Sequence, residues 1–172
     1  MPTVRTTRTI NASSAKIWAV LSDFSNIQIF HPNVLDVDQL SQVDRGVGAE
    51  RRCNFYDGSS AVEKIISWDD EQQFFTCTVT EIAAPILDVT AGMRVNVIDS
   101  DRSEVQIEMT YVPKWGIFGK ILDVLMLRIV MRSTFNKVLK GLKHHVETGE
   151  LIGKNGKPTP RFPQTTTPQL DG

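Results

Sequence analysis

The sequence is poor in several features that mark whole classes of protein. It has only two cysteines in 172 residues, which excludes the disulfide framework that stabilises many small secreted domains. Neither cysteine belongs to a CxxC or clustered Cys/His motif, so we predict no metal site and no cofactor. We expect Cys53 and Cys77 to be reduced core residues, because free cysteine packs as a small apolar side chain.

Long apolar runs and an excess of basic residues are also missing. No stretch approaches the roughly 20 apolar residues that cross a bilayer, and residues 1–10 lack the apolar segment of a secretory signal. The formal net charge is −1, from 19 basic and 20 acidic residues, which disfavours a nucleic-acid partner. These absences predict a cytoplasmic protein without stable membrane insertion.

The residues that are present suit one ordinary globular domain with a tail. Hydrophobic residues make up 41% of the chain, enough for a sizeable core at this length. Residues 153–172 contain four prolines and almost no large apolar side chains. We therefore predict a domain over residues 1–149 and disorder over residues 150–172.

Hydrophobic periodicity predicts an α+β fold. A strand over Thr3–Ile10 precedes a helix capped by Ser13 or Ser14 and a second short helical stretch that ends before Pro32. Alternating residues between 34 and 113 predict six further strands, separated by Gly-, Asp- and Ser-containing breaks. From about residue 117 to residue 146 the period becomes 3.6, which predicts a helix of roughly 45 Å. The order favours a curved antiparallel sheet wrapped around one long C-terminal helix.

Five segments, in this order and spacing, carry a resemblance to a known superfamily. They read INASSAKIWAVLSDFSNIQIFHP, GVGAERRCNFYDG, VEKIISWDDEQQFF, YVPKWGIFG and FNKVLKGLKHHVETG. The chain resembles the START-like, Bet v 1-like (SRPBCC) helix-grip superfamily, and within it the polyketide cyclase/dehydrase branch. The resemblance implies a seven-stranded sheet and two short helices between its first and second strands.

The resemblance also implies a cavity between the sheet and the long helix, with loops 57–61 and 82–92 as its gate. In the abscisic acid receptors, another branch, an acidic residue that faces the pocket corresponds to Glu63. Those receptors also use a pocket lysine at a position that resembles Phe30, so we do not expect binding of that hormone here.

The charged candidates leave alternatives open. Alternation in residues 61–68 turns either Glu63 or Lys64 inward; apolarity favours Lys64 inward, and the resemblance favours Glu63. Arg51 shares a face with Cys53 and Phe55 and either holds a carboxylate inside the fold or extends to solvent at the strand end. His31, next to a proline, is a loop hydrogen-bonding residue or a proton-transfer group.

Apolar residues complete the predicted ligand site. If the fold is hollow, the cavity is lined by Phe30, Phe55, Phe75, Met93 and Tyr111. Arg128 lies near the sheet-facing stripe of the long helix and could reach the cavity from that side. Residues of this kind can also simply fill a core.

The first half of the predicted helix is apolar on two faces. One stripe, which continues to Val146, faces the sheet; the opposite side consists of Leu122, Leu125, Met126, Ile129 and Val130. These residues need a cover, for which we favour the gate loops and residues 24–32 over a second subunit or a lipid surface. The chain is thus predicted to be a monomer or a homodimer.

Three functions fit these observations. The first is a carrier or sensor that binds a small hydrophobic or amphipathic ligand, such as a lipid, polyketide or hormone-like molecule, in an internal cavity. The second is a cofactor-free cyclase or dehydratase, in which Glu63 or His31 moves a proton on a polyketide-like substrate. The third is an interaction protein that uses the apolar half of the helix.

Overall fold

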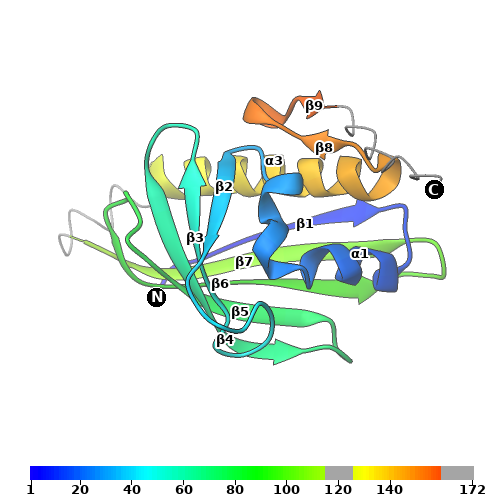
Figure 1. Ribbon diagram of the computed structural model, residues 1–172, viewed down its shortest axis with the longest axis horizontal. Helices are drawn as coiled ribbons and strands as arrows, with labels where there is room; N and C mark the ends of the chain where they lie inside the picture. The colour runs from blue at the N-terminus through cyan, green and yellow to red at the C-terminus, as the bar shows by residue number, and fades with distance from the viewer. Residues whose placement is uncertain (115–125, 160–172) are drawn as a thin grey trace, which may run out of the picture.

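The structure is a computed structural model that describes residues 1–114 and 126–159 (Figure 1). Its centre is one seven-stranded antiparallel sheet with the order β1-β7-β6-β5-β4-β3-β2. The strands are β1 (Thr3–Ile10), β2 (Val34–Gln39), β3 (Glu50–Phe55), β4 (Ser60–Asp69), β5 (Phe74–Thr80), β6 (Ile86–Val97) and β7 (Ser103–Pro113). Strands β2 to β7 form a meander, and β1 pairs with β7.

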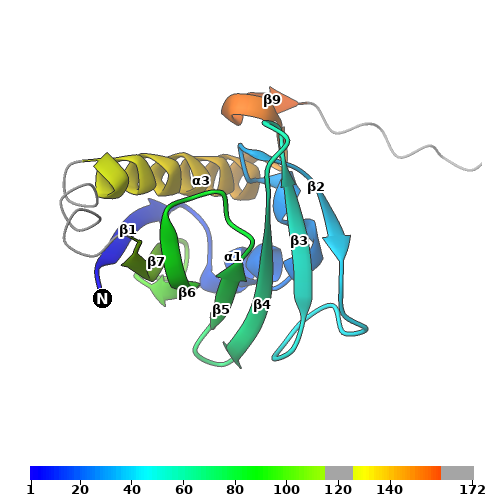
Figure 2. The same ribbon diagram turned by 90° about the vertical axis from the view of Figure 1, so that its left-hand side faces the viewer.

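Three helices lie on the inner side of this curved sheet (Figure 2). α1 (Ser14–Leu21) and the 3-10 helix η1 (Phe24–Ile29) separate β1 from β2, and α3 (Arg128–Thr148) follows the sheet. Ser13 caps α1, since its hydroxyl accepts the Lys16 backbone N–H at 3.4 Å. The predicted helix-grip α+β fold is confirmed.

The strands show the predicted division between a buried and an open face. On β5 and β7 every second residue is buried, and these residues are Phe75, Cys77, Val79, Ser103, Val105, Ile107, Met109 and Tyr111. Because side chains alternate across a strand, the intervening threonines, glutamates and glutamines occupy the outer face. The inner face is the one that the helices cover.

A β-bulge in β4 explains why its alternation is ambiguous. The pairing with β5 shifts register between Ile65 and Ser67. Before the shift Glu63 and Ile65 point inward, and after it Trp68 packs on the core and stacks on Phe75. The inward side chains of this strand therefore occupy odd-numbered positions before the bulge and an even-numbered position after it. Lys64, the alternative inward residue, is exposed and pairs with Glu50 at 3.3 Å.

α3 buries the predicted stripe, in the part of the helix that the structure describes. Its buried apolar side chains are Phe135, Val138, Leu139, Leu142 and Val146. The predicted start of the helix, with Leu122, Val124 and Leu125, lies outside the described residues. Of the helices that are described, none is long and apolar enough to cross a membrane.

Within the described residues, the opposite face of the same helix lacks the predicted cover by residues 24–32. Met126 and Ile129 are 62% and 65% exposed, and Val130, which is 56% exposed, borders the cavity described below. Residues 24–32 cannot cover them, because η1 and the loop after it pack elsewhere: the Phe30 carbonyl oxygen lies against Gly141, in the second half of α3. Among the residues that the structure describes, this face of α3 is open.

The predicted disorder from residue 150 does not hold for residues 151–159. The helix ends at Gly149 (φ 77°), and the chain returns as β8 (Leu151–Ile152), the 3-10 turn η3 (Lys154–Gly156) and β9 (Pro158–Thr159). Asn155 and Gly156 both have positive φ, as the Asn-Gly pair of a tight hairpin turn does. Ile152 is 4% exposed and anchors the hairpin. Residues 160–172 lie outside the described residues.

Candidate functional site

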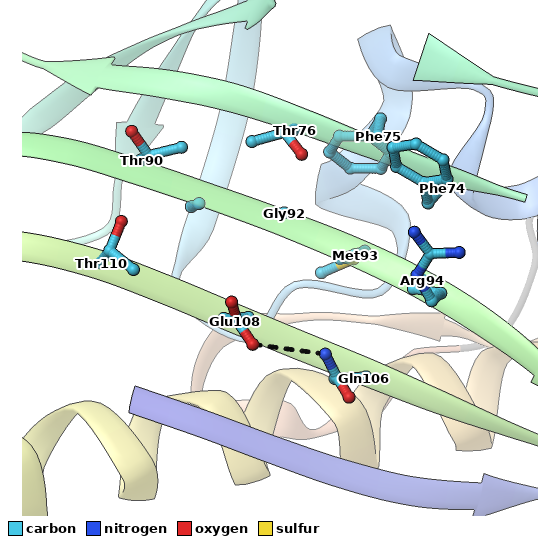
Figure 3. Close-up of a pocket in the computed structure, with 11 residues that line it drawn as sticks. Phe74, Phe75, Thr76, Thr90, Gly92, Met93, Arg94, Gln106, Glu108 and Thr110 are labelled. Atoms are coloured by element: carbon cyan, nitrogen blue, oxygen red, sulfur yellow. Dashed lines mark hydrogen bonds between the residues drawn. The ribbon is translucent and has the colours of Figure 1, made fainter. Parts of the chain in front are cut away.

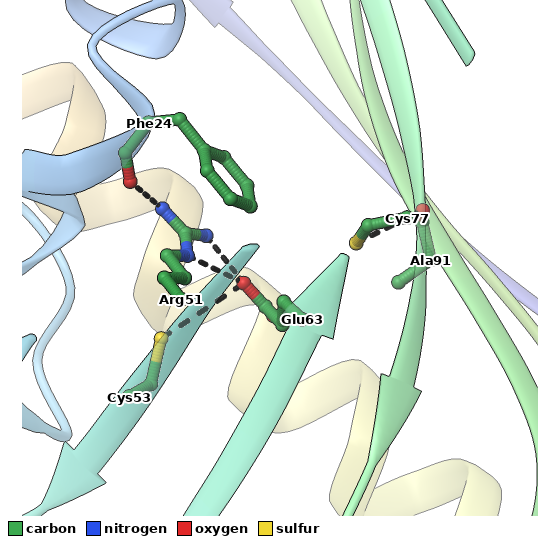
Figure 4. Close-up of polar contacts among 6 residues, drawn as sticks. All are labelled: Phe24, Arg51, Cys53, Glu63, Cys77 and Ala91. Carbon is green, nitrogen blue, oxygen red and sulfur yellow. Dashed lines mark hydrogen bonds and ion pairs between the residues drawn. The ribbon is translucent and has the colours of Figure 1, made fainter. Parts of the chain in front are cut away.

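The polar centre of the inner face is an ion pair between neighbouring strands. Arg51 on β3 and Glu63 on β4 are direct partners in the sheet register. The Arg51 Nε and Nη2 atoms both donate to Glu63 Oε2, at 2.8 and 2.5 Å (Figure 4). The Arg51 side chain is 4% exposed and that of Glu63 is 20% exposed. Arg51 therefore does not extend to solvent, and Glu63 is the inward carboxylate.

The rest of the guanidinium is held by η1. Arg51 Nη1 donates to the Phe24 carbonyl oxygen, and the Arg51 Cζ atom lies 3.7 Å from the centre of the Phe24 ring. Burial is the largest single effect on Arg51 and opposes its charge, but the charge and hydrogen bonds of Glu63, together with smaller effects of Cys53 and Cys77, sum to a raised pKa of Arg51. The side chain is thus fixed on three sides as a permanent cation.

His31 stands beside this pair in the loop between η1 and β2. Burial lowers the pKa of His31 to about 4, against the opposing effect of Glu63, and Arg51 adds to the lowering. The ring is therefore neutral at pH 7. Its Nδ1 accepts the Asn33 backbone N–H at 3.2 Å, which places the proton on Nε2. Within the described residues Nε2 has no hydrogen-bond partner, so it can donate to a bound molecule.

The two cysteines border the polar centre without being reactive. The Cys53 Sγ atom lies 3.9 Å from Glu63 Oε2. Burial, aided by Glu63, raises the pKa of Cys53 to about 12, and the pKa of Cys77 is also raised well above its usual value by burial. Since the thiolate is the nucleophilic form, both residues act as core side chains, as predicted.

A cavity of about 570 Å³ adjoins this centre. Its walls are mainly apolar and come from β3, β4, β5, β7, loop 82–84 and the first two turns of α3. A smaller chamber of about 90 Å³ lies deeper, between the sheet and α3. Four residues line both spaces, namely His31, Glu63, Met109 and Phe135. The polar groups thus stand where the large cavity meets the inner chamber.

Six of the nine predicted ligand-binding residues line these spaces. His31, Glu63 and Phe55 line the large cavity. The inner chamber is lined by Arg51, Phe75 and Met93 together with His31 and Glu63. Their contact with a ligand stays a prediction.

The other three predicted residues do not line either space. Phe30 and Tyr111 are fully packed in the core, at 3% and 0% exposure. Arg128 is the first residue of α3 and lies outside the lining, because the helix turns Leu127, Val130 and Met131 toward the cavity instead. The predicted gate is also shorter on one side: residues 86–92 belong to β6, so only residues 82–84 line the opening.

Sequence reasoning missed a part of the cavity wall that comes from the C-terminal hairpin. Lys154 and Asn155 in η3 line the cavity, next to Tyr56 and Asp57 of the β3–β4 turn. The Asn-Gly dipeptide at 155–156, preceded by the apolar pair Leu151 and Ile152, is the signal that could have predicted this hairpin.

A separate shallow hollow of about 180 Å³ lies on the outer face of the sheet (Figure 3). It forms around Gly92, where a Cβ atom would lie 2.6 Å from the Phe75 carbonyl oxygen. Polar side chains such as Thr90, Gln106 and Glu108 surround it. The hollow shares Phe75, Ala91, Gly92 and Met93 with the lining of the inner chamber, but none of the polar residues His31, Arg51 and Glu63 lines it.

Between residues 1 and 114 and between 126 and 159, no three His, Cys, Asp or Glu side chains gather closely enough to hold a metal ion. The site combines a mainly apolar cavity with the Arg51–Glu63 ion pair, the neutral imidazole of His31, and the charged residues Asp57 and Lys154 in the lining.

Comparison with known proteins identifies the family. The family model described as "Polyketide cyclase / dehydrase and lipid transport" matches residues 1–147. The chain belongs to this family. No curated protein matches the chain. The match covers the whole sheet and nearly all of α3, and it ends before the C-terminal hairpin.

Solved structures share the fold of this polyketide cyclase/dehydrase family member. An uncharacterised protein from Bacillus thuringiensis is 17% identical with a TM-score of 0.71, covering 85% of this chain and 99% of its own. The Streptomyces aromatase/cyclase Zhui is 16% identical with a TM-score of 0.65, covering 88% and 99%. Truncated norcoclaurine synthase from Thalictrum flavum is 17% identical with a TM-score of 0.68, covering 86% and 94%. At these identities the likeness concerns the fold.

Proposed function

We propose that this protein binds a small hydrophobic or amphipathic molecule in the 570 Å³ cavity, as a carrier or sensor. The observation that carries the proposal is an apolar cavity of ligand size that ends at a buried polar centre. Cavities of several hundred Å³ with few, fixed polar groups are typical of small-molecule sites. The family description, which includes lipid transport, supports the same class of ligand.

The polar centre would orient one end of such a ligand. Among the described residues the His31 Nε2–H has no acceptor, and Glu63 Oε2 already accepts from Arg51. A ligand hydroxyl or carbonyl at this end would find a neutral donor beside a fixed ion pair. The apolar body would then lie along Val79, Met109 and Phe135 toward the opening.

Native mass spectrometry of the purified protein tests the proposal. A reproducible extra mass that is lost on denaturation supports a carried ligand. The matched variants are Ala61→Phe, which adds volume inside the cavity, and Thr90→Phe, which adds the same group on the outer face. We expect Ala61→Phe alone to lose the added mass and the binding of an apolar fluorescent probe. Equal probe binding in both variants would contradict the proposal.

A second candidate is a cofactor-free cyclase or dehydratase on a polyketide-like substrate. It is supported by the imidazole and carboxylate that lie at one end of the cavity. It is also supported by Zhui, a protein of the same fold that is named an aromatase/cyclase. With a pKa of about 4, His31 is a weak base at pH 7 and better suited to hydrogen-bond donation. Turnover of a polyketide-like substrate that disappears in Glu63→Gln would favour this candidate over a carrier.

A further inference from the structure

The C-terminal hairpin adds to the cavity a wall that the family match does not include. The family model ends at residue 147, whereas Lys154 and Asn155 line the 570 Å³ cavity. Figure 2 shows the hairpin lying beside the β3–β4 turn, whose residues Tyr56 and Asp57 also line the cavity. This part of the site is therefore a property of this chain beyond the matched family domain.

The hairpin is anchored to the segment that carries His31. The Asn155 backbone N–H donates to the Pro32 carbonyl oxygen at 3.1 Å. Ile152 packs against Gly141 of α3, where a Cβ would also collide with the Phe30 carbonyl oxygen at 2.2 Å. These contacts hold η3 at the cavity opening as part of the folded domain.

Lys154 is the cation at this opening that has no carboxylate partner. The other charged residues in the lining contact other groups: the Asp57 Oδ1 atom accepts from the Ser59 backbone N–H at 2.9 Å and from its hydroxyl at 2.6 Å, so that Asp57 stays an anion, and Glu63 pairs with Arg51. Among the described residues Lys154 forms no ion pair. Its Nζ lies 5.7 Å from the centre of the Tyr56 ring, a contact that keeps the ammonium group near the opening.

We propose that Lys154 selects ligands with an anionic end, a carboxylate or a phosphate, whose apolar body enters the cavity. The inference rests on the proposed function, because it assumes that the cavity takes an amphipathic molecule. The placement of the charges is its basis: Arg51 and Glu63 pair at the inner end, whereas at the opening Lys154 forms no ion pair among the described residues, and the Asp57 carboxylate of the same lining is held by Ser59. An anion at the opening would complete the pairing and stay partly hydrated.

Three ligands with one alkyl chain and different head groups test the inference: dodecanoate, dodecyl phosphate and dodecanol. Binding is measured by displacement of an apolar fluorescent probe from the full chain, at low and high salt. The variants are Lys154→Met, Lys154→Arg and, as the matched control, Lys157→Met, an exposed lysine of the same hairpin that is outside the lining. Circular dichroism confirms that each variant is folded.

We expect Lys154→Met to weaken binding of the anionic ligands by about two- to fivefold, as for a partly exposed ion pair, and to leave dodecanol unchanged. Lys154→Arg should keep the preference, Lys157→Met should have no effect, and high salt should reduce the preference. The anionic ligand whose binding weakens more in Lys154→Met carries the preferred head group. Equal loss in Lys154→Met and Lys157→Met, or dodecanol bound by the wild type as tightly as the anions, would overturn the inference alone. Failure of all three ligands to compete in the wild type would overturn the proposed function as well.

Discussion

The substitution Glu63→Gln removes one charge from the buried pair and keeps the shape of the side chain. Arg51 would then keep its charge at 4% side-chain exposure, with the Phe24 carbonyl oxygen and ring as its remaining close partners. Loss of one partner from a buried pair typically costs about 3–5 kcal/mol of unfolding free energy. Because Glu63 is 20% exposed toward the cavity, we expect the lower end, about 3 kcal/mol.

Thermal and urea unfolding measure this loss. For a chain of this length about 3 kcal/mol corresponds to a Tm decrease of roughly 6–12 °C. The matched control is Glu50→Gln, which breaks the Lys64 pair on the same two strands, one register position away. That pair is largely exposed, so its loss should cost less than about 1 kcal/mol.

A double variant separates the ion pair from other effects of substitution. Arg51→Met with Glu63→Leu replaces both charges with apolar groups, and such replacements are often close to neutral. We expect it to be more stable than Glu63→Gln alone. If Glu63→Gln lowers the stability no more than Glu50→Gln does, Arg51 does not depend on Glu63 and the reasoning is refuted.

Three further predictions follow from single positions. The pKa of His31 is about 4 in the folded protein and 6.5 in the unfolded chain, so the unfolded chain binds more protons between these pH values, and the free energy of unfolding should fall by on the order of 2 kcal/mol from pH 7 to pH 5. Urea titrations of His31→Gln should lack this part of the pH dependence. The same pH dependence in wild type and variant would contradict the prediction. Gly141→Ala should lower the free energy of unfolding by roughly 1–3 kcal/mol despite the better helix propensity of alanine, because the added Cβ atom would collide with the Phe30 carbonyl oxygen. A higher Tm of this variant in thermal unfolding would contradict that packing. If the open face of α3 self-associates, the mass in sedimentation velocity should rise with concentration and Ile129→Lys should abolish the rise; a constant 19.3 kDa for the wild type would exclude it.

Local pattern alone determined most of the secondary structure and the fold class. The alternation in residues 74–80 and 103–113 and the stripe from Phe135 to Val146 predicted the buried faces that the structure has. Such patterns are reliable where one face is buried along an entire element, because side-chain periodicity then directly reports burial. The pattern was ambiguous in β4, where a bulge changes the inward parity within one strand.

Only the tertiary structure decided which charges meet and where the cavity opens. Arg51 and Glu63 are 12 residues apart, and their contact depends on the register of β3 and β4, which alternation does not specify. The same holds for Lys154, whose place at the opening depends on the return of the chain after Gly149 and its docking on Pro32. Long-range packing sets these positions, since burial of Ile152 and the bond from Asn155 to Pro32 join segments that are remote in the sequence.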